Sequence, residues 1–182
     1  HGSASVVGID ISENMLKRAR IMHGSPKIEY ICMPVEDYEY PPNSFDVVIS
    51  SLTLHYIQSF EDICDKVSHT LKAGGIFTFS VEHPIFTAYG NQDWYYNEKG
   101  EKLHWPVDGY FIEGIRKAVF LGEEVTKYHH TLTTYVNGVL KKGFVIKQLI
   151  EPQPSDEFIK TIPEMRDELR RPMMLIMLAV KS

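Results

Sequence analysis

The segment Val6-Val7-Gly8-Ile9-Asp10 most constrains the fold, because a short apolar run ends on an acid and leads directly into a helical pattern. Such a run is typical of a strand buried in a parallel sheet. Ser12 is a good helix N-cap. The apolar residues that follow recur at helical spacing: Met15, Leu16, Ala19 and Met22. The chain therefore opens with a strand and a helix.

The same alternation continues along the chain. A helix is expected over Phe60–Leu71, where Gly74-Gly75 stops it, and strands over Ile28–Met33, Phe45–Ser50 and Ile76–Val81. The run Val47-Val48-Ile49 predicts that the second of these strands is buried on both faces. This order predicts an α/β protein with a doubly wound, mostly parallel sheet and crossover helices.

Residues 84–127 break the alternation. They are rich in Tyr, Trp, Gly and Asn, and short alternating stretches within them predict a small antiparallel flap over the crevice. A helix over about Thr131–Leu140 and strands over Phe144–Glu151 and Met173–Val180 complete the chain. We therefore expect a cofactor-binding core over 1–83, an insertion or lid over 84–130, and the last helix and strands of the same domain over 131–182.

Composition excludes several classes of function. The net charge of −5 argues against a nucleic-acid partner bound by bulk charge. The longest apolar run, Met173–Val180, is far shorter than the roughly 20 residues of a membrane span. Cys32 and Cys64 follow no spacing pattern and are expected to be free, buried thiols. These features predict a cytoplasmic protein with no membrane partner.

Asp10 has two interpretations. It either caps the helix that follows, or it accepts hydrogen bonds from the ribose hydroxyls of a nucleoside cofactor at the carboxyl end of the strand. In the second case, a glycine-rich loop should lie roughly 20 residues upstream. That position falls before residue 1.

Three stretches carry a resemblance to a known family: Val6–Ser12 (VVGIDIS), Val35–Ser50 (VEDYEYPPNSFDVVIS) and Leu71–Ser80 (LKAGGIFTFS). In this order and spacing they resemble the later motifs of class I S-adenosylmethionine-dependent methyltransferases of type 11, similar to the ubiquinone-biosynthesis C-methyltransferases. The resemblance covers residues 3–83 well and the last two strands moderately. It implies a Rossmann-like sheet with an antiparallel last strand, and S-adenosyl-L-methionine as cofactor with S-adenosyl-L-homocysteine as product.

The resemblance also implies cofactor-binding residues. Asp10 would hold the ribose, Ile11 would pack on the adenine, and Val35 and Glu36 would lie at the adenine edge. This chain has Pro34 where the family often has an acid that accepts from the adenine amino group, and Glu36 or a backbone carbonyl would have to replace that acid. Glu36 can also be read as part of an ordinary acidic loop. The stretch Ser50, Ser51 and Leu52 would lie beside the methionine part.

Two histidines are candidate general bases. His55 follows the predicted strand Phe45–Ser50, and His83 follows Ile76–Val81, so both lie at the carboxyl edge of the sheet. Pro84 restricts His83 to an extended conformation. The alternatives are that His55 caps a short helix and that His83 bonds a backbone carbonyl in a turn.

Aromatic side chains are concentrated in and near the insertion, where they either close a lid over a small acceptor or form the insertion's own core. The expected substrate-binding residues are Tyr56, Trp94, Tyr110, Tyr128 and His129. No metal site is expected, because His129 and His130 are adjacent and have no Cys or acidic partner at ligand spacing.

The resulting prediction is a methyltransferase that transfers a methyl group from S-adenosyl-L-methionine to a small molecule. The alternatives are a catalytically inactive or truncated Rossmann-like binding module and a nucleotide-dependent oxidoreductase. In the family order, a strand that precedes residue 1 lies between Val6–Asp10 and Phe45–Ser50. We therefore expect a longer protein, an incomplete cofactor site in this chain, and exposed strand edges that favour a homodimer.

Overall fold

A computed structural model describes residues 2–120 and 122–182. The chain divides into two compact units, with the boundary between Tyr40 and Pro41. This boundary is not one of those expected at residues 83 and 130. The expected boundaries separate segments by function, as cofactor-binding core, lid and last elements, and they stay a prediction. Over the described ranges, none of the helices combines the length and the apolar character that a membrane crossing requires.

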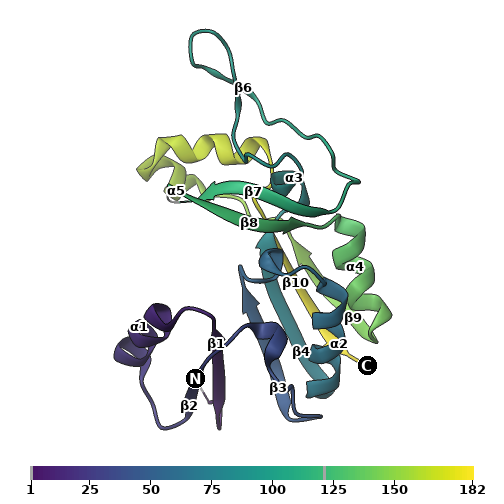
Figure 1. Ribbon diagram of the computed structural model, residues 1–182. Coiled ribbons are helices and arrows are strands. Elements are labelled where there is room, and N and C mark those ends of the chain that lie inside the picture. Colours follow the sequence, from purple (N-terminus) through teal and green to yellow (C-terminus); the bar gives the residue numbers. More distant parts are fainter. Residues whose placement is uncertain (1, 121) are drawn as a thin grey trace. The chain divides into compact units, whose positions relative to one another are not determined.

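The first unit contains a parallel strand pair and one long helix, drawn in purple and dark blue in Figure 1. Its elements are β1 (Val6–Asp10), α1 (Glu13–His23), β2 (Ile28–Cys32) and the 3-10 turn η1 (Val35–Asp37). Ser12 Oγ accepts the Met15 N–H at 3.3 Å and so caps α1, as its sequence position predicts. Leu16 is the buried residue of α1, at 3% exposure.

The second unit is built on a four-stranded sheet in the order β3-β4-β10-β9. These strands are β3 (Phe45–Ser51), β4 (Leu71–Glu82), β9 (Phe144–Ile150) and β10 (Met174–Lys181). Strands β3 and β4 are parallel, whereas β10 is antiparallel to both of its neighbours. The predicted Rossmann-like α/β class with an antiparallel last strand is confirmed.

Two helices of the second unit, α2 (Phe60–Thr70) and α4 (Leu132–Lys141), pack side by side (Figure 1). Gly138 makes this approach possible, because a Cβ atom there would lie 3.0 Å from the Phe60 ring. The Phe60 ring also meets Tyr135 edge-on, with centroids 4.8 Å apart. These aromatic contacts form the core beneath the carboxyl ends of β3 and β4.

Three details differ from the sequence predictions. Strand β4 begins at Leu71 rather than Ile76, because Gly74, at φ +75°, lies within an irregular start of the strand instead of ending a helix. One face of β3 is exposed, since Val47 is 46% and Ile49 72% accessible. Cys32 is exposed, whereas Cys64 is buried as expected, and both are free thiols.

The insertion contains antiparallel pairing, as the alternating pattern predicts, in two hairpins, and also a short helix that was not predicted. The helix is α3 (Pro84–Thr87), and the hairpins are β5 (Tyr95–Tyr96) with β6 (Lys102–His104) and β7 (Gly114–Phe120) with β8 (Glu123–His129). Whether these hairpins close over a substrate stays a prediction.

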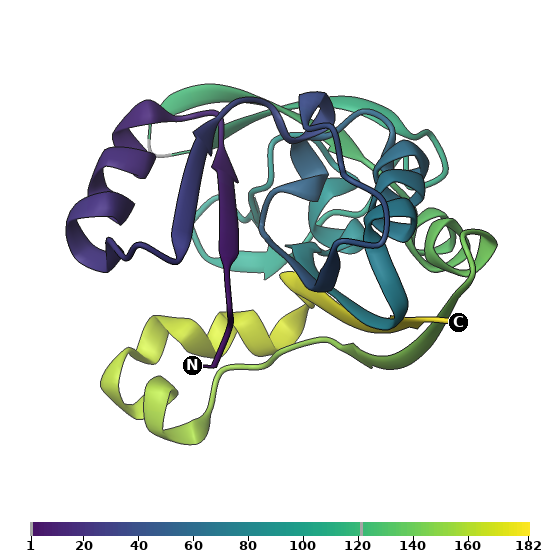
Figure 2. The ribbon, with the colours of Figure 1, turned by 90° about the horizontal axis from the view of Figure 1, so that it is seen from below.

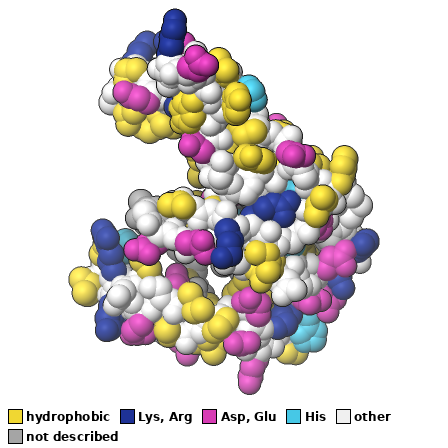
Figure 3. Space-filling view, turned by 45° about the horizontal axis from the view of Figure 1, so that its top comes forward, with side chains coloured by type: hydrophobic (Ala, Val, Ile, Leu, Met, Phe, Trp, Pro, Cys, Tyr) yellow, Lys and Arg dark blue, Asp and Glu magenta, His cyan; other side chains and the backbone are white. Residues whose placement is uncertain are grey.

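The connection from β9 to β10 carries two helical turns, drawn in yellow-green in Figure 2. They are α5 (Asp156–Thr161) and the 3-10 helix η3 (Pro163–Arg170). A further 3-10 turn, η2 (Leu54–Tyr56), follows β3. The face shown in Figure 3 intersperses Lys and Arg with Asp and Glu, which agrees with the low net charge.

Candidate functional site

In the first unit, Asp10 lies at the carboxyl end of β1 with its side chain held in place. Asp10 Oδ1 accepts the Ser12 N–H at 2.7 Å, and no described residue donates to Oδ2. The two interpretations of this acid are therefore compatible, because one oxygen serves the start of α1 and the other remains available. A carboxylate with a fixed orientation and an open oxygen fits the hydroxyls of a ribose.

The other predicted cofactor residues of this unit lie in the loops after β1 and β2. The Ile11 side chain is 72% exposed, which suits an apolar contact with a flat ring. Val35 begins η1, and its carbonyl accepts the Tyr40 hydroxyl at 3.1 Å. Glu36 is exposed in the same turn. Burial raises the pKa of Tyr40 to about 12, so its hydroxyl keeps this hydrogen bond at neutral pH.

In the second unit, the predicted residues Ser50 and Ser51 end β3, and Leu52 follows directly after the strand. Leu52 has a φ of +52°, a left-handed conformation that is rare for a branched side chain. Its N–H donates to the Ser80 carbonyl at 2.9 Å and lies 3.2 Å from Ser80 Oγ. A backbone hydrogen bond to the neighbouring strand thus fixes this turn at the carboxyl edge of the sheet, where ligands of α/β proteins bind.

His55 is buried beneath this edge, with 2% exposure. Its Nδ1 accepts the Glu82 N–H at 3.3 Å, so the neutral ring carries its proton on Nε2. Burial lowers the pKa of His55 to about 4, with Glu82 opposing and Lys127 adding to the shift. Its predicted role as a base requires the bond to Glu82 to open. Tyr56, with its ring 4.4 Å from His55, is 37% exposed.

His83 is also an acceptor for the backbone. It has the extended conformation that Pro84 predicts, and its Nδ1 caps α3 by accepting the Ile85 N–H at 3.0 Å. Its Nε2 lies 2.9 Å from Glu151 Oε1 without the geometry of a hydrogen bond. Burial lowers the pKa of His83, and Glu151 opposes that shift. His83 thus bonds the backbone in a turn, as one interpretation predicts. Its ring accepts a backbone N–H, however, and does not donate to a backbone carbonyl.

A closed ring of three side chains beside His55 was not predicted. Lys127 Nζ donates to Glu82 Oε1 at 2.5 Å and to Gln92 Oε1 at 2.9 Å, and Gln92 Nε2 donates to Glu82 Oε2 at 2.6 Å. Lys127 is 2% exposed. The alternation of β8 contained the signal, because Val125, Lys127 and His129 share one face of that strand.

The remaining predicted substrate residues on β8 and before β7 bind each other or lie half-buried. His129 Nε2 donates to the Tyr110 carbonyl at 2.8 Å, and its Nδ1 lies 2.7 Å from Thr87 Oγ1. The Tyr110 hydroxyl accepts the Leu132 N–H at 3.1 Å. Tyr128 lies on the opposite face of β8 and is half-buried. Tyr110 and His129 therefore belong to the insertion's own core, as the second interpretation of its aromatic residues states.

Trp94 lines a cavity that we call the indole cavity, with a volume of about 320 Å³. Its lining includes Ile85, Trp94, Trp105, Val107, Arg170 and Arg171. The two indole rings meet edge-on at 5.3 Å. Among the residues that the structure describes, no group of three or more His, Cys, Asp or Glu side chains could hold a metal ion.

Comparisons with known proteins agree with the fold. A family model described as a methyltransferase domain matches residues 1–79. The crystal structure of a candidate S-adenosylmethionine-dependent methyltransferase from Listeria monocytogenes is 55% identical, with a TM-score of 0.95, and the match covers 100% of this chain and 82% of that one.

Curated relatives extend this result. An uncharacterised protein from Haemophilus influenzae is 31% identical over 187 residues, covering 99% of this chain and 73% of that protein. A ubiquinone biosynthesis O-methyltransferase from Neisseria meningitidis is 35% identical over 84 residues, 44% of this chain and 35% of that enzyme. The predicted family and its cofactor are confirmed: the chain belongs to the S-adenosylmethionine-dependent methyltransferases.

Proposed function

We propose that this protein transfers a methyl group from S-adenosyl-L-methionine to a small-molecule acceptor. The observation that carries the proposal is the state of Asp10, whose carboxylate is oriented by the Ser12 N–H and has an oxygen without a donor among the described residues. Asp10 is half-buried, and two ribose hydroxyls would supply hydrogen-bond donors to its open oxygen.

The cofactor supplies a methyl group on a positively charged sulfur. In the first unit, we expect Asp10 to hold the ribose, and Ile11 and Val35 to contact the adenine. That Ser50 to Leu52 of the second unit contact the methionine part, as the resemblance implies, stays a prediction. Transfer of a methyl group from a sulfonium needs positioning more than covalent help. This agrees with His55 and His83, whose Nδ1 atoms already accept backbone N–H groups.

A small acceptor is supported by the charge of the chain and by the cavity in the insertion. The net charge is −5, and the indole cavity falls within the roughly 300–1,000 Å³ of small-molecule sites. The relative from Neisseria meningitidis that bears the name of a ubiquinone-biosynthesis enzyme points in the same direction. Nucleic acid and membrane are not part of the proposal, and a homodimer stays a prediction.

Calorimetry tests the proposal. The full chain is titrated separately with S-adenosylmethionine, S-adenosylhomocysteine and NAD. Saturable binding of the first two and none of NAD is expected. Binding of NAD alone would favour the oxidoreductase alternative and overturn the proposal. Transfer of a labelled methyl group to small acceptors then separates an enzyme from an inactive binding module.

A further inference from the structure

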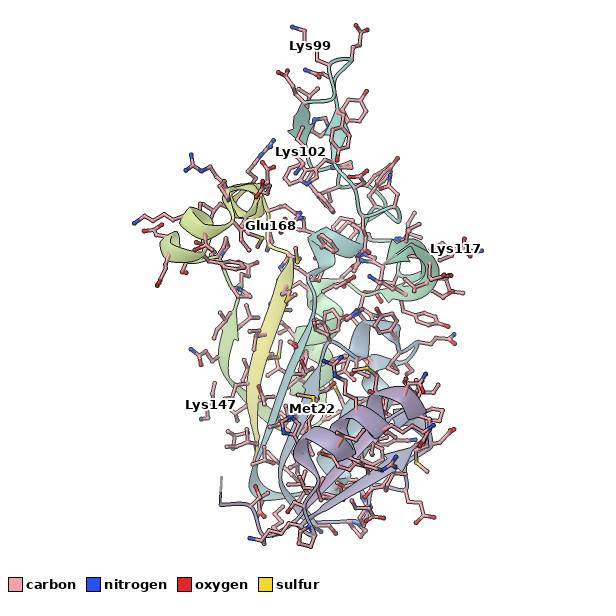
Figure 4. All side chains as sticks on the ribbon, turned by 90° about the vertical axis from the view of Figure 1, so that its left-hand side faces the viewer. Met22, Lys99, Lys102, Lys117, Lys147 and Glu168 are labelled. Atoms are coloured by element: carbon pink, nitrogen blue, oxygen red, sulfur yellow. The ribbon has the colours of Figure 1, made fainter. Side chains whose placement is uncertain are left out.

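The indole cavity combines apolar walls with two guanidinium groups. Trp94, Trp105, Ile85 and Val107 supply the apolar lining, and Arg170 and Arg171 supply positive charge. Figure 4 shows Lys102 of β6 and Glu168 of η3 on the neighbouring segments that meet here. Both tryptophans of the chain line this cavity.

Arg171 is held in a rigid position beside the indoles. Its guanidinium carbon lies 4.2 Å from the Trp105 ring centroid and 4.7 Å from that of Phe86. Its two terminal nitrogens donate to the Glu168 carboxylate at 2.6 and 3.2 Å. The side chain is 5% exposed, yet its buried Nε–H has no acceptor among the described residues.

Arg170 adds a second, more accessible cation. Its guanidinium carbon lies 4.5 Å from the Trp94 ring centroid, and its Nη2 donates to the Leu103 carbonyl at 2.6 Å. Asp167 accepts from both Arg170 and Lys102. Three cations therefore pair with two of the acids of η3, Asp167 and Glu168, so this cluster carries one net positive charge beside the apolar walls.

We propose that the indole cavity binds the carboxylate group of a small apolar acid. One unsatisfied Nε–H beside a second guanidinium suits a carboxylate, whose planar oxygens match such donors. A phosphate has more oxygens to satisfy and a stronger hydration shell to lose, so it fits an indole-lined cavity less well. The ligand class is thus an aromatic or short-chain carboxylic acid.

Two residues that line the indole cavity lie close in sequence to the end of β4. Ile85 lines the cavity and follows directly after the pair His83-Pro84, and Trp94 is two residues beyond Gln92, which bonds Glu82. A carboxylate held there would anchor an acceptor whose reacting group extends towards this edge. As an anchor for the acceptor, the assignment rests on the proposed function.

Tryptophan fluorescence provides a direct measurement, because both emitting residues lie in the cavity. The full chain is titrated with phenylacetate and with phenylacetamide, which has the same ring and no charge. Saturable change with phenylacetate and binding at least about tenfold weaker for the amide are expected, the scale of a charge-assisted hydrogen bond. Equal binding of the two, or no change with either, would overturn the proposal.

Two variants locate the effect. Arg171→Lys keeps the charge but removes the Nε–H, so phenylacetate should bind about tenfold more weakly while the amide is unaffected. Lys147→Gln removes one charge from β9, labelled in Figure 4, and should leave binding of phenylacetate unchanged. If Arg171→Lys does not fold, Arg170→Gln on the exposed side of the cavity provides the same test. Wild-type affinity for phenylacetate in whichever Arg variant folds would overturn the role of the guanidinium groups.

Calorimetry with S-adenosylhomocysteine keeps this inference separate from the proposed function. The Arg171→Lys and Arg170→Gln variants should bind it as the wild type does. If the wild type binds phenylacetate but not S-adenosylhomocysteine, the proposed function is refuted and the carboxylate site stands. The reverse result would refute the site alone.

Discussion

The Lys127 ammonium lies 2.5 Å from Glu82 Oε1, and only 2% of the Lys127 side chain is exposed. This pair joins β8 of the insertion to the last residue of β4. Because β4 also supplies the backbone N–H that His55 accepts, the ion pair positions the insertion and the histidine together.

Lys127→Met should therefore destabilise the protein by about 3 kcal/mol, since the Glu82 carboxylate would remain largely buried without its cation. Urea unfolding measures the change in the free energy of unfolding. The exposed pair Lys117–Glu124 in the same hairpin provides the control, because Lys117→Met should cost less than about 1 kcal/mol. Equal effects of the two substitutions would contradict the account.

The sequence predicted the strands and helices because these follow local patterns of two and 3.6 residues, whereas the antiparallel direction of the last strand was implied by the resemblance to the methyltransferases. It did not predict the ring of Glu82, Gln92 and Lys127, whose members come from three segments and meet only after the insertion has folded. The exposure of Val47 and Ile49 was also missed, because an apolar run does not reveal which neighbours a strand has.

The candidate site likewise combines residues that the sequence indicates with contacts that only the folded chain creates. Asp10 is a candidate because an acid that ends a strand is a local signal, which the resemblance to the methyltransferases strengthens. The tautomers of His55 and His83 depend on the Glu82 and Ile85 N–H groups, so no sequence pattern could have fixed them. The cavity beside Arg171 joins residues of the insertion with Arg170, the last residue of η3, and the two residues that follow it, which lie far apart from the insertion in the chain.

Stability should fall as the pH decreases from about 6.5 to 4, because burial lowers the pKa of His55 to about 4. In that range the unfolded chain binds a proton that the folded chain does not, which favours unfolding. The contribution of His55 is fully present above pH 6.5. His55→Asn should flatten the decline by an amount on the order of 3 kcal/mol, measured by urea unfolding at several pH values.

The same substitution at exposed His69 controls for the loss of an imidazole. A pH profile that His55→Asn leaves unaltered would show that this histidine is not buried in its neutral form.

Gly138→Ala should destabilise the protein by about 1 kcal/mol, although alanine favours helices. The new Cβ would lie 3.0 Å from two atoms of the Phe60 ring, which is 1% exposed and cannot yield. Asn137→Ala, at the neighbouring exposed position of α4, should be neutral or slightly stabilising. Thermal unfolding compares the two, and a stabilising Gly138→Ala would refute the close packing of α2 on α4.

Alkylation should distinguish the two thiols in the native protein. Burial raises the pKa of Cys64 to about 12, and its side chain is inaccessible, whereas Cys32 is exposed. Iodoacetamide at mildly alkaline pH should modify Cys32 and spare Cys64, as read by peptide mass spectrometry. Equal rates of modification would contradict the packing of α2, and unfolding in urea should make both thiols reactive.

The most direct test of the account is calorimetric titration of the wild type, Asp10→Ala and Glu29→Gln with S-adenosylhomocysteine. The wild type should bind it saturably. Asp10→Ala should weaken binding by about 1–3 kcal/mol, or roughly 5- to 150-fold, through loss of the ribose acceptor. Glu29→Gln removes an exposed acid from β2 in the same unit and should leave the dissociation constant unchanged. No binding by the wild type, or equal dissociation constants for the wild type and Asp10→Ala, would contradict the proposed cofactor site.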